Sequence, residues 1–205
     1  MIQRPGRMRL ALVAALVAVG CRSRPLSASE VDQIAAALAL EEGSRLADVG
    51  AGDGEWTIEL APHVGRTGHV WATEVDPDNL ASIEERVARL GLDNVTVVLG
   101  DQQATGLPDA CCDRMLMRLV YHHFEDPATM RASLIRALEP GGRVVVIDIK
   151  PQASWRELPN VPDRGGHGIE PDVLVREMAA DGFRVVDRRD GWHDDPDRFC
   201  IVFER

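Results

Sequence analysis

Residues 46–57 read Leu-Ala-Asp-Val-Gly-Ala-Gly-Asp-Gly-Glu-Trp-Thr, and this stretch decides the fold. An apolar run leads into Asp48, and glycines then follow at every second position, at Gly50, Gly52 and Gly54. The apolar run predicts a buried strand, and the glycines allow a tight turn and a close approach of the backbone to a ligand. The stretch therefore predicts a strand, a turn and a helix, with a ligand at the turn.

The spacing of these glycines separates different kinds of nucleotide-binding turn. A dinucleotide-binding turn reads G-x-G-x-x-G and opens a helix that holds a pyrophosphate. Here the third glycine comes one residue early and Glu55 follows it. No G-K-[S/T] occurs in the chain, which excludes a Walker-type phosphate loop. Because glycines also make ordinary strand-to-helix turns, the nature of the ligand depends on residues further along the chain.

The length and charge of the chain limit its organisation and its partners. Its 205 residues are enough for one domain with a full core. The net charge is −10, and beyond five arginines in the first 25 residues the chain carries 18 basic and 33 acidic residues. Such a body repels phosphate backbones, so we expect no nucleic-acid partner. The composition leaves the oligomeric state open.

The N-terminus has the features of a leader for export. Arginines precede an unbroken apolar stretch over 10–19, which is too short to span a bilayer but matches the core of a secretory signal peptide. Ala18-Val-Gly-Cys21 resembles a bacterial lipoprotein processing site. We therefore expect a leader over 1–21, a lipid on Cys21 that attaches the protein to a membrane, a linker over 22–29 and one domain over 30–205. The alternatives, an unprocessed apolar leader or a start at Met8, would leave the protein in the cytoplasm.

Strand and helix patterns alternate through the rest of the chain. Ser27-Ala-Ser-Glu30 has the capping-box pattern and precedes an apolar helical face. We expect strands at 45–50, 69–74, 95–99, 114–120 and 143–149, and helices at 56–63, 79–90, 127–138 and 171–180. The Pro140-Gly-Gly sequence is expected to end the third of these helices. Two last strands, 183–188 and 198–203, lie close together and predict a hairpin. The pattern predicts an α/β fold with a Rossmann-like, doubly wound seven-stranded sheet, mostly parallel with a C-terminal antiparallel hairpin.

Acidic residues stand at three predicted strand ends, where doubly wound sheets bind their ligands. Asp48 is at the end of the first strand, and Glu74 follows the second, where its two oxygens match the vicinal hydroxyls of a ribose. Asp101 follows the third and can accept a hydrogen bond from the amine of an adenine. Each acid alone is more often a solvated loop residue. Together with the glycine turn, they favour an adenosine-containing, cationic ligand.

From about residue 30 to 150 the chain resembles class I S-adenosylmethionine-dependent methyltransferases, in particular those of the ubiquinone/menaquinone-biosynthesis type. The motifs that carry the resemblance are the glycine turn, Glu74, Gly100-Asp101, Tyr121-His-His-Phe-Glu-Asp-Pro and Leu138-Glu-Pro-Gly-Gly-Arg-Val. The resemblance implies S-adenosylmethionine as the cofactor and a small-molecule or lipid-like acceptor that the motifs do not identify. The expected cofactor-binding residues are Asp48, Gly50, Ala51, Gly52, Glu74, Val75, Asp101, Gln102 and Arg118.

The reaction that this resemblance implies is an in-line displacement at the sulfonium methyl, for which positioning and desolvation supply most of the catalysis. A hydroxyl or acidic carbon as acceptor also needs a base. His122 and His123, after the fourth strand, and His167, in a glycine-rich loop, are the candidates because histidine titrates near neutral pH. Each also fits a packing or surface role. No metal site is predicted, because adjacent histidines rarely ligate one ion and no C-x-x-C pair is present.

Other functions are also compatible with the sequence. A non-catalytic module that binds S-adenosylmethionine or a nucleoside would suit an exported protein without a supply of a cytosolic cofactor. An NAD-dependent oxidoreductase fits poorly because of the early third glycine and the C-terminal hairpin. Cys111 and Cys112 could suggest arsenic methylation, although small buried residues leading into a strand are the simpler interpretation.

Overall fold

A computed structural model describes residues 29–152, 161, 162, 164 and 166–205 of the chain. The predicted leader, its Cys21 and nearly all of the predicted linker lie outside the described residues. In the part of the chain that is described, no helix is both long and apolar enough to cross a membrane. The structure therefore bears on the folded domain and not on the predicted lipid anchor.

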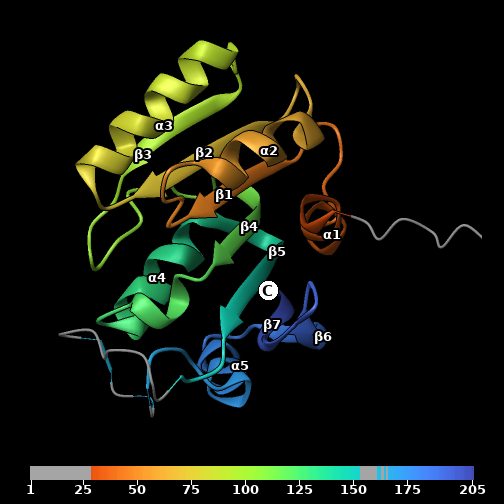
Figure 1. Cartoon of the computed structure of the whole chain (residues 1–205), viewed down its shortest axis with the longest axis vertical. Coiled ribbons are helices and arrows are strands. Elements are labelled where there is room, and N and C mark those ends of the chain that lie inside the picture. Colours follow the sequence, from red (N-terminus) through yellow and green to blue (C-terminus); the bar gives the residue numbers. More distant parts are fainter. Residues whose placement is uncertain (1–28, 153–160, 163, 165) are drawn as a thin grey trace, which may run out of the picture.

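Within the described residues, seven strands form one sheet in the order β3-β2-β1-β4-β5-β7-β6 (Figure 1). The parallel strands are β1 (Arg45–Val49), β2 (His69–Glu74), β3 (Val95–Leu99), β4 (Cys112–Arg118) and β5 (Leu138–Ile149). β7 (Asp195–Glu204) pairs antiparallel with both β5 and β6 (Arg184–Trp192). The strand order reverses between β1 and β4, which is the switch point of a doubly wound sheet. The predicted fold class is confirmed.

Helices cover both faces of the sheet (Figure 1). One face carries α1 (Glu30–Leu38), α2 (Glu55–Val64) and α3 (Pro77–Leu90), and the other carries α4 (Pro127–Ala137) and α5 (Pro171–Ala180). Alternate residues of β5 serve the two faces: Val145 and Ile147 pack with α1 and α2, whereas Val144 and Val146 pack with α4 and α5. Because both faces are covered, the inner strands contain apolar runs, which is why they could be recognised in the sequence, whereas the edge strand β6 is polar and mostly exposed.

The start of α1 differs from the sequence prediction. The N-cap is Ser29, and its hydroxyl accepts a hydrogen bond from the Asp32 backbone N–H at 3.1 Å. Asp32 completes the capping box by accepting from the Ser29 backbone N–H at 3.3 Å. The prediction that placed the capping box at Ser27 and Glu30 was therefore wrong by two residues, because aspartate serves here in place of the more usual glutamate or glutamine.

The last strands are longer than the sequence pattern indicated. α4 ends at Ala137, one residue before the predicted end, but Pro140-Gly-Gly lies inside β5, where the pairing with β4 shifts between Cys112 and Arg114. The β6–β7 turn consists of His193 and Asp194, with φ of 49° and 63°. Two residues with positive φ make a type I′ turn, whose twist matches that of the flanking strands, so the pairing continues up to the turn.

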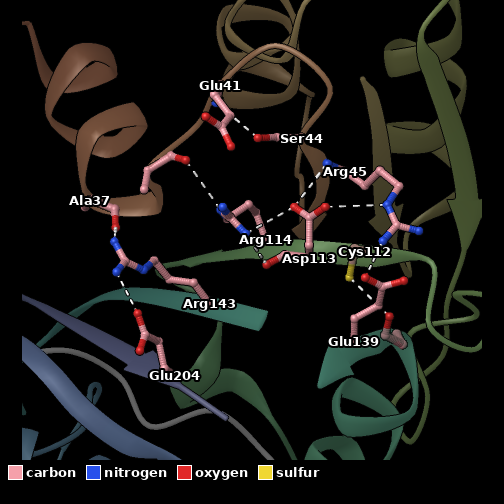
Figure 2. A network of polar contacts seen from close by, with 12 residues as sticks. Ala37, Glu41, Ser44, Arg45, Cys112, Asp113, Arg114, Glu139, Arg143 and Glu204 are labelled. Atoms are coloured by element: carbon pink, nitrogen blue, oxygen red, sulfur yellow. Dashed lines mark hydrogen bonds and ion pairs between the residues drawn. The ribbon is translucent and has the colours of Figure 1, made fainter. Parts of the chain in front are cut away.

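A network of ion pairs connects the amino-terminal ends of the strands at one end of the sheet (Figure 2). Arg45 of β1 contacts the Glu139 carboxylate at 2.5 Å and the Asp113 carboxylate at 3.5 Å. Arg143 of β5 contacts Glu204 at 2.6 Å. Cys112 lies at the same edge, where its thiol donates to the Ala137 carbonyl at 3.4 Å. These contacts tie neighbouring elements together at the end of the sheet opposite to the carboxyl ends of β1 to β5.

The antiparallel end of the sheet is part of the core, so a cavity made there should destabilise the whole domain. Phe199 of β7 is fully buried in the cluster that includes α4 and α5. We expect Phe199→Ala to lower the free energy of unfolding by about 3–5 kcal/mol in urea titrations. Val185→Ala is the control, because this β6 side chain is 40% exposed, and should change it by less than about 0.5 kcal/mol. Equal effects of the two substitutions would contradict this description of the core.

Candidate functional site

A cavity of about 470 Å³ opens at the carboxyl ends of the parallel strands. Its volume is within the range of small-molecule sites, roughly 300–1,000 Å³. Segments after β1, β2, β3 and β4 all contribute to its wall, as expected for a ligand site at the switch point. Of the residues predicted to bind cofactor or to act in catalysis, six line the cavity: Gly50, Glu74, Val75, Asp101, Gln102 and His123.

The glycine turn is held against the end of β2 by Glu74. The Glu74 carboxylate accepts hydrogen bonds from the backbone N–H groups of Gly52 and Val75, both at 2.8 Å. Gly50 has φ of 70°, and a Cβ at this position would lie 2.3 Å from a methyl group of Val120. Glycine is therefore required here both by the backbone conformation and by the close approach of the segment after β4. At Gly52, also with positive φ, a Cβ would meet nothing within 4 Å.

Asp48 lies in the protein interior, one residue before the cavity wall begins at Val49. It is 2% exposed, and the Thr57 hydroxyl of α2 donates to its Oδ2 at 2.6 Å. Burial raises the pKa of the Asp48 carboxyl to about 6, against the opposing effects of the Thr57 hydrogen bond and the Arg118 charge. The Asp48 carboxylate would accordingly act on the cofactor through its charge and not through direct contact at the cavity surface. Ala51, also predicted, packs in the small cluster with Ala72 and Ile83.

The loop after β3 presents Asp101 and Gln102 to the cavity in a fixed conformation. The Asp101 carboxylate accepts from the backbone N–H groups of Gln103 and Ala104, both at 2.7 Å. The Asp101 backbone N–H donates to the Ala104 carbonyl at 2.8 Å. These bonds close a tight turn, so the loop is held in place without a ligand.

The three candidate histidines come together beside the cavity. His122 and His123 belong to the short 3₁₀ helix η1 (Tyr121–His123), which follows β4. Their ring centroids are 4.1 Å apart, and the Nε2 atoms of His122 and His167 are 3.0 Å apart. Partial burial, followed by the neighbouring His122 and His167 rings, lowers the pKa of His123. His123 reaches the cavity wall, whereas His122 is buried behind it.

A buried carboxylate that the sequence analysis missed orients His122. Asp148 of β5 is fully buried, and its Oδ1 lies 2.5 Å from His122 Nδ1. Because a carboxylate only accepts, the proton of a neutral His122 ring is assigned to Nδ1, which leaves the Nε2 lone pair facing His167. The signal was present in the sequence as a single acid within the apolar run of β5. A buried acid at a strand end is expensive unless it has partners, so it indicates a site.

Arg118 has a different setting from the one expected for a cofactor ligand. Its guanidinium pairs with Glu30 of α1 at 3.2 Å and lies 4.2 Å from the centre of the Trp56 ring. Glu30 also accepts a hydrogen bond from the buried Trp192 indole at 3.0 Å. Arg118 thus ties α1 to the sheet and is not among the residues that line the cavity. The apolar lining residues Leu119, Val120, Phe124 and Met130 carried no signal in the sequence that distinguished them from core residues.

Comparisons with known proteins agree with this geometry. Residues 46–142 match the family model of a methyltransferase domain. A demethylmenaquinone methyltransferase of Anoxybacillus flavithermus is 30% identical over 109 residues, which cover 53% of this chain and 46% of that protein. One of Listeria monocytogenes serotype 4a is 26% identical over 123 residues, covering 60% and 49%. The chain spans about half the length of the curated relatives it matches.

Solved structures share the fold. A methyltransferase of Aquifex aeolicus dependent on S-adenosylmethionine superposes with a TM-score of 0.70 at 24% identity, over 85% of this chain and 88% of that one. The match identifies residues 46–142 as a methyltransferase domain, and the fold is that of the class I S-adenosylmethionine-dependent methyltransferases, a family that implies S-adenosylmethionine as the cofactor. Among the proteins of this family, it is distantly related to the demethylmenaquinone methyltransferases.

The buried carboxyl of Asp48 should make stability depend on pH. Its pKa is 3.8 when unperturbed and about 6 in the folded protein, so the folded state binds more protons and loses stability as the pH rises through this window. We expect Asp48→Asn to raise the free energy of unfolding by about 1–3 kcal/mol at pH 7.5 and by much less at pH 5, measured by urea titration. Glu84→Gln, an exposed change on α3, should have little effect at either pH. An equal gain from Asp48→Asn at both pH values would contradict the assigned shift.

Proposed function

We propose that this protein transfers the methyl group of S-adenosylmethionine to a small-molecule acceptor that enters the cavity beside His123. The observation that carries the proposal is that one cavity is lined both by the acids Glu74 and Asp101 and by His123. A ligand whose adenosyl group contacts the acids therefore shares its cavity with a member of the histidine cluster. Cofactor and acceptor can meet there without a further domain.

The charge of the cavity suits a cationic cofactor. Glu74 and Asp101 line it, and Asp48 is buried close to the glycine turn. Glu74 Oε1 accepts from the backbone N–H groups of Val75 and Asp76, whereas Oε2 accepts from Gly52 and keeps a second lone-pair site with which it can accept a ribose hydroxyl. The chemistry of the acids at the strand ends favours the ribose at the same residue and the adenine at Asp101. The sulfonium then belongs near the glycine turn and the start of the segment after β4.

Methyl transfer requires little covalent chemistry from the protein. A lone pair of the acceptor forms a bond to the methyl carbon, the carbon–sulfur bond breaks, and its electron pair stays on sulfur as a neutral thioether. The positive charge of the sulfonium disappears in this step, so catalysis comes mainly from alignment and from the exclusion of water. When the acceptor is a hydroxyl or an acidic carbon, its proton must also leave, and we assign its removal to the histidine cluster.

The lining beside His123 favours an acceptor with an apolar part. Leu119, Val120, Phe124 and Met130 contribute to this wall. The relatives named as demethylmenaquinone methyltransferases act, by that name, on a small molecule, which supports an acceptor of this size here. The same fold also occurs in the cyclase SpnF, with a TM-score of 0.68 at 18% identity over 85% of this chain and 79% of that one. Because the fold does not determine the reaction, the proposal of methyl transfer rests on the residues that line the cavity.

Loss of the Glu74 carboxylate should weaken cofactor binding. We expect Glu74→Ala to weaken the binding of S-adenosylmethionine and S-adenosylhomocysteine by about 1–3 kcal/mol, roughly 5- to 150-fold, because it removes ligand contacts and frees the Gly52 backbone N–H. Isothermal titration calorimetry measures this. Glu59→Ala, an exposed change on α2, should leave affinity unaltered.

Failure of the intact, folded protein to bind either ligand would refute the proposed function. Transfer itself is measured with methyl-labelled S-adenosylmethionine and a bacterial lipid or metabolite extract, followed by isolation of the labelled product. Tight cofactor binding without any labelled product would favour the non-catalytic binding module instead.

We also propose, on the sequence pattern alone, that Cys21 is the lipid-modified first residue of the mature protein. Mass spectrometry of the native N-terminus tests this directly. The expected result is a chain that begins at Cys21 and carries a diacylglycerol group. An intact N-terminus at Met1 or Met8 would contradict it and would place the enzyme where the cofactor is made.

A further inference from the structure

The histidine cluster has the geometry of a metal site. Within the described residues, one group of three potential ligands lies close enough together to hold an ion, and it consists of His122, His123 and His167. One ligand atom from each residue lies within 4.8 Å of the others, and the two nearest nitrogens are 3.0 Å apart. A tetrahedral ion about 2.1 Å from each nitrogen needs its ligands roughly 3.4 Å apart, so small ring rotations suffice.

The fold brings these rings together although their spacing in the sequence gave no sign of it. The tight turn of η1 directs the adjacent rings of His122 and His123 toward the same side, with an angle of 44° between their planes. His167 is fixed by backbone pairing, because its carbonyl accepts from the Gln152 N–H at 2.9 Å. Two residues later, the Ile169 N–H donates to the Ile149 carbonyl at 2.9 Å. His167 is therefore attached to the segment that extends β5.

Asp148 supplies the orienting carboxylate that histidine metal ligands commonly have. Its Oδ1 lies 2.5 Å from His122 Nδ1 and also accepts from the Ile149 N–H at 2.8 Å. Its Oδ2 accepts from the His122 backbone N–H at 3.2 Å. These contacts fix the ring of His122 from behind and present Nε2 to the other two histidines. An apolar residue would pack equally well in this position, so packing does not explain a buried acid there whose oxygens all accept hydrogen bonds.

We propose that His122, His123 and His167 bind one divalent transition-metal ion, with Zn²⁺ as the best-suited type. Imidazole nitrogen is a preferred ligand of Zn²⁺, and three protein ligands leave a fourth position for a water or a substrate. Hard cations such as Mg²⁺ and Ca²⁺ prefer oxygen ligands and do not suit a set of three nitrogens. Because His123 lines the cavity, the open position faces the space assigned to the acceptor.

The consequence for catalysis rests on the proposed methyl transfer. With the ion bound, the ring lone pairs are taken by the metal, so the cluster acts through the ion and not as a base. An acceptor hydroxyl that occupies the open position loses its proton to water at a lower pH, because the ion stabilises the oxyanion. The oxyanion lone pair then forms the bond to the methyl carbon as the carbon–sulfur bond breaks. The site thereby selects oxygen acceptors able to bind the ion, such as phenols and enols, over amines.

Metal binding by the whole chain tests the site without cofactor or acceptor. The protein is stripped with EDTA, dialysed and titrated with Zn²⁺ by calorimetry, and with Co²⁺ by visible absorption. We expect one ion per chain and a Co²⁺ spectrum of low coordination number. His123→Ala and His167→Ala should each weaken binding at least tenfold, and Asp148→Asn by roughly 10- to 100-fold. His193→Ala in the exposed β6–β7 turn and Cys111→Ser at the opposite edge of the sheet are the matched controls and should bind as the unmodified protein does.

The absence of stoichiometric binding, or binding that survives the loss of both His123 and His167, would overturn the metal site. These two side chains are not fully buried, so their substitution should leave the fold intact, which circular dichroism checks for each variant. If the protein binds S-adenosylmethionine but no metal ion, this inference is overturned and the proposed function stands. Metal binding without S-adenosylmethionine binding would do the reverse.

Discussion

The carboxylate of Glu74 is the interaction on which the ligand edge of this domain depends. It ends β2 and accepts the Gly52 N–H of the neighbouring strand's turn at 2.8 Å. The same glycine turn approaches the segment after β4 so closely that Gly50 has no room for a side chain beside Val120. Parallel strands bring their carboxyl ends to one edge, and these two contacts fix the loops there relative to one another. The cavity follows from this arrangement.

A second carboxylate organises the other part of the site. Asp148 is fully buried at the end of β5, and three donors surround it, two of them from His122. Glu74 thus orders the part of the cavity assigned to the cofactor, and Asp148 orders the histidines beside the part assigned to the acceptor. Asp48, buried close to the same turn, adds negative charge at a cost in stability. Three buried acids near one edge are difficult to explain by folding alone and favour a ligand that uses them.

The parts of this structure that could be predicted are those encoded by local pattern. Buried strands, the glycine turn and the acids at strand ends appear in the sequence within a few residues of one another. The histidine cluster could not be predicted, because His122 and His167 are 45 residues apart and meet only through the backbone pairing beside β5. Arg118 was expected to bind cofactor from its place at the end of β4, but its pairing partner Glu30 comes from α1, whose start the capping pattern misplaced. Asp148 did carry a signal, as the single acid in the apolar run 144–149 of β5.

Family membership identifies the cofactor but not the reaction, since the same fold occurs in a cyclase. Methyl transfer in this cavity requires one arrangement, in which the adenosyl group contacts Glu74 and Asp101 while the sulfur faces the histidine cluster. A crystal structure of the protein with S-adenosylhomocysteine measures it most directly. We predict the ribose hydroxyls on Glu74, the adenine beside Asp101 and the sulfur directed toward His123. A ligand bound in the reverse orientation, or outside this cavity, would contradict the account.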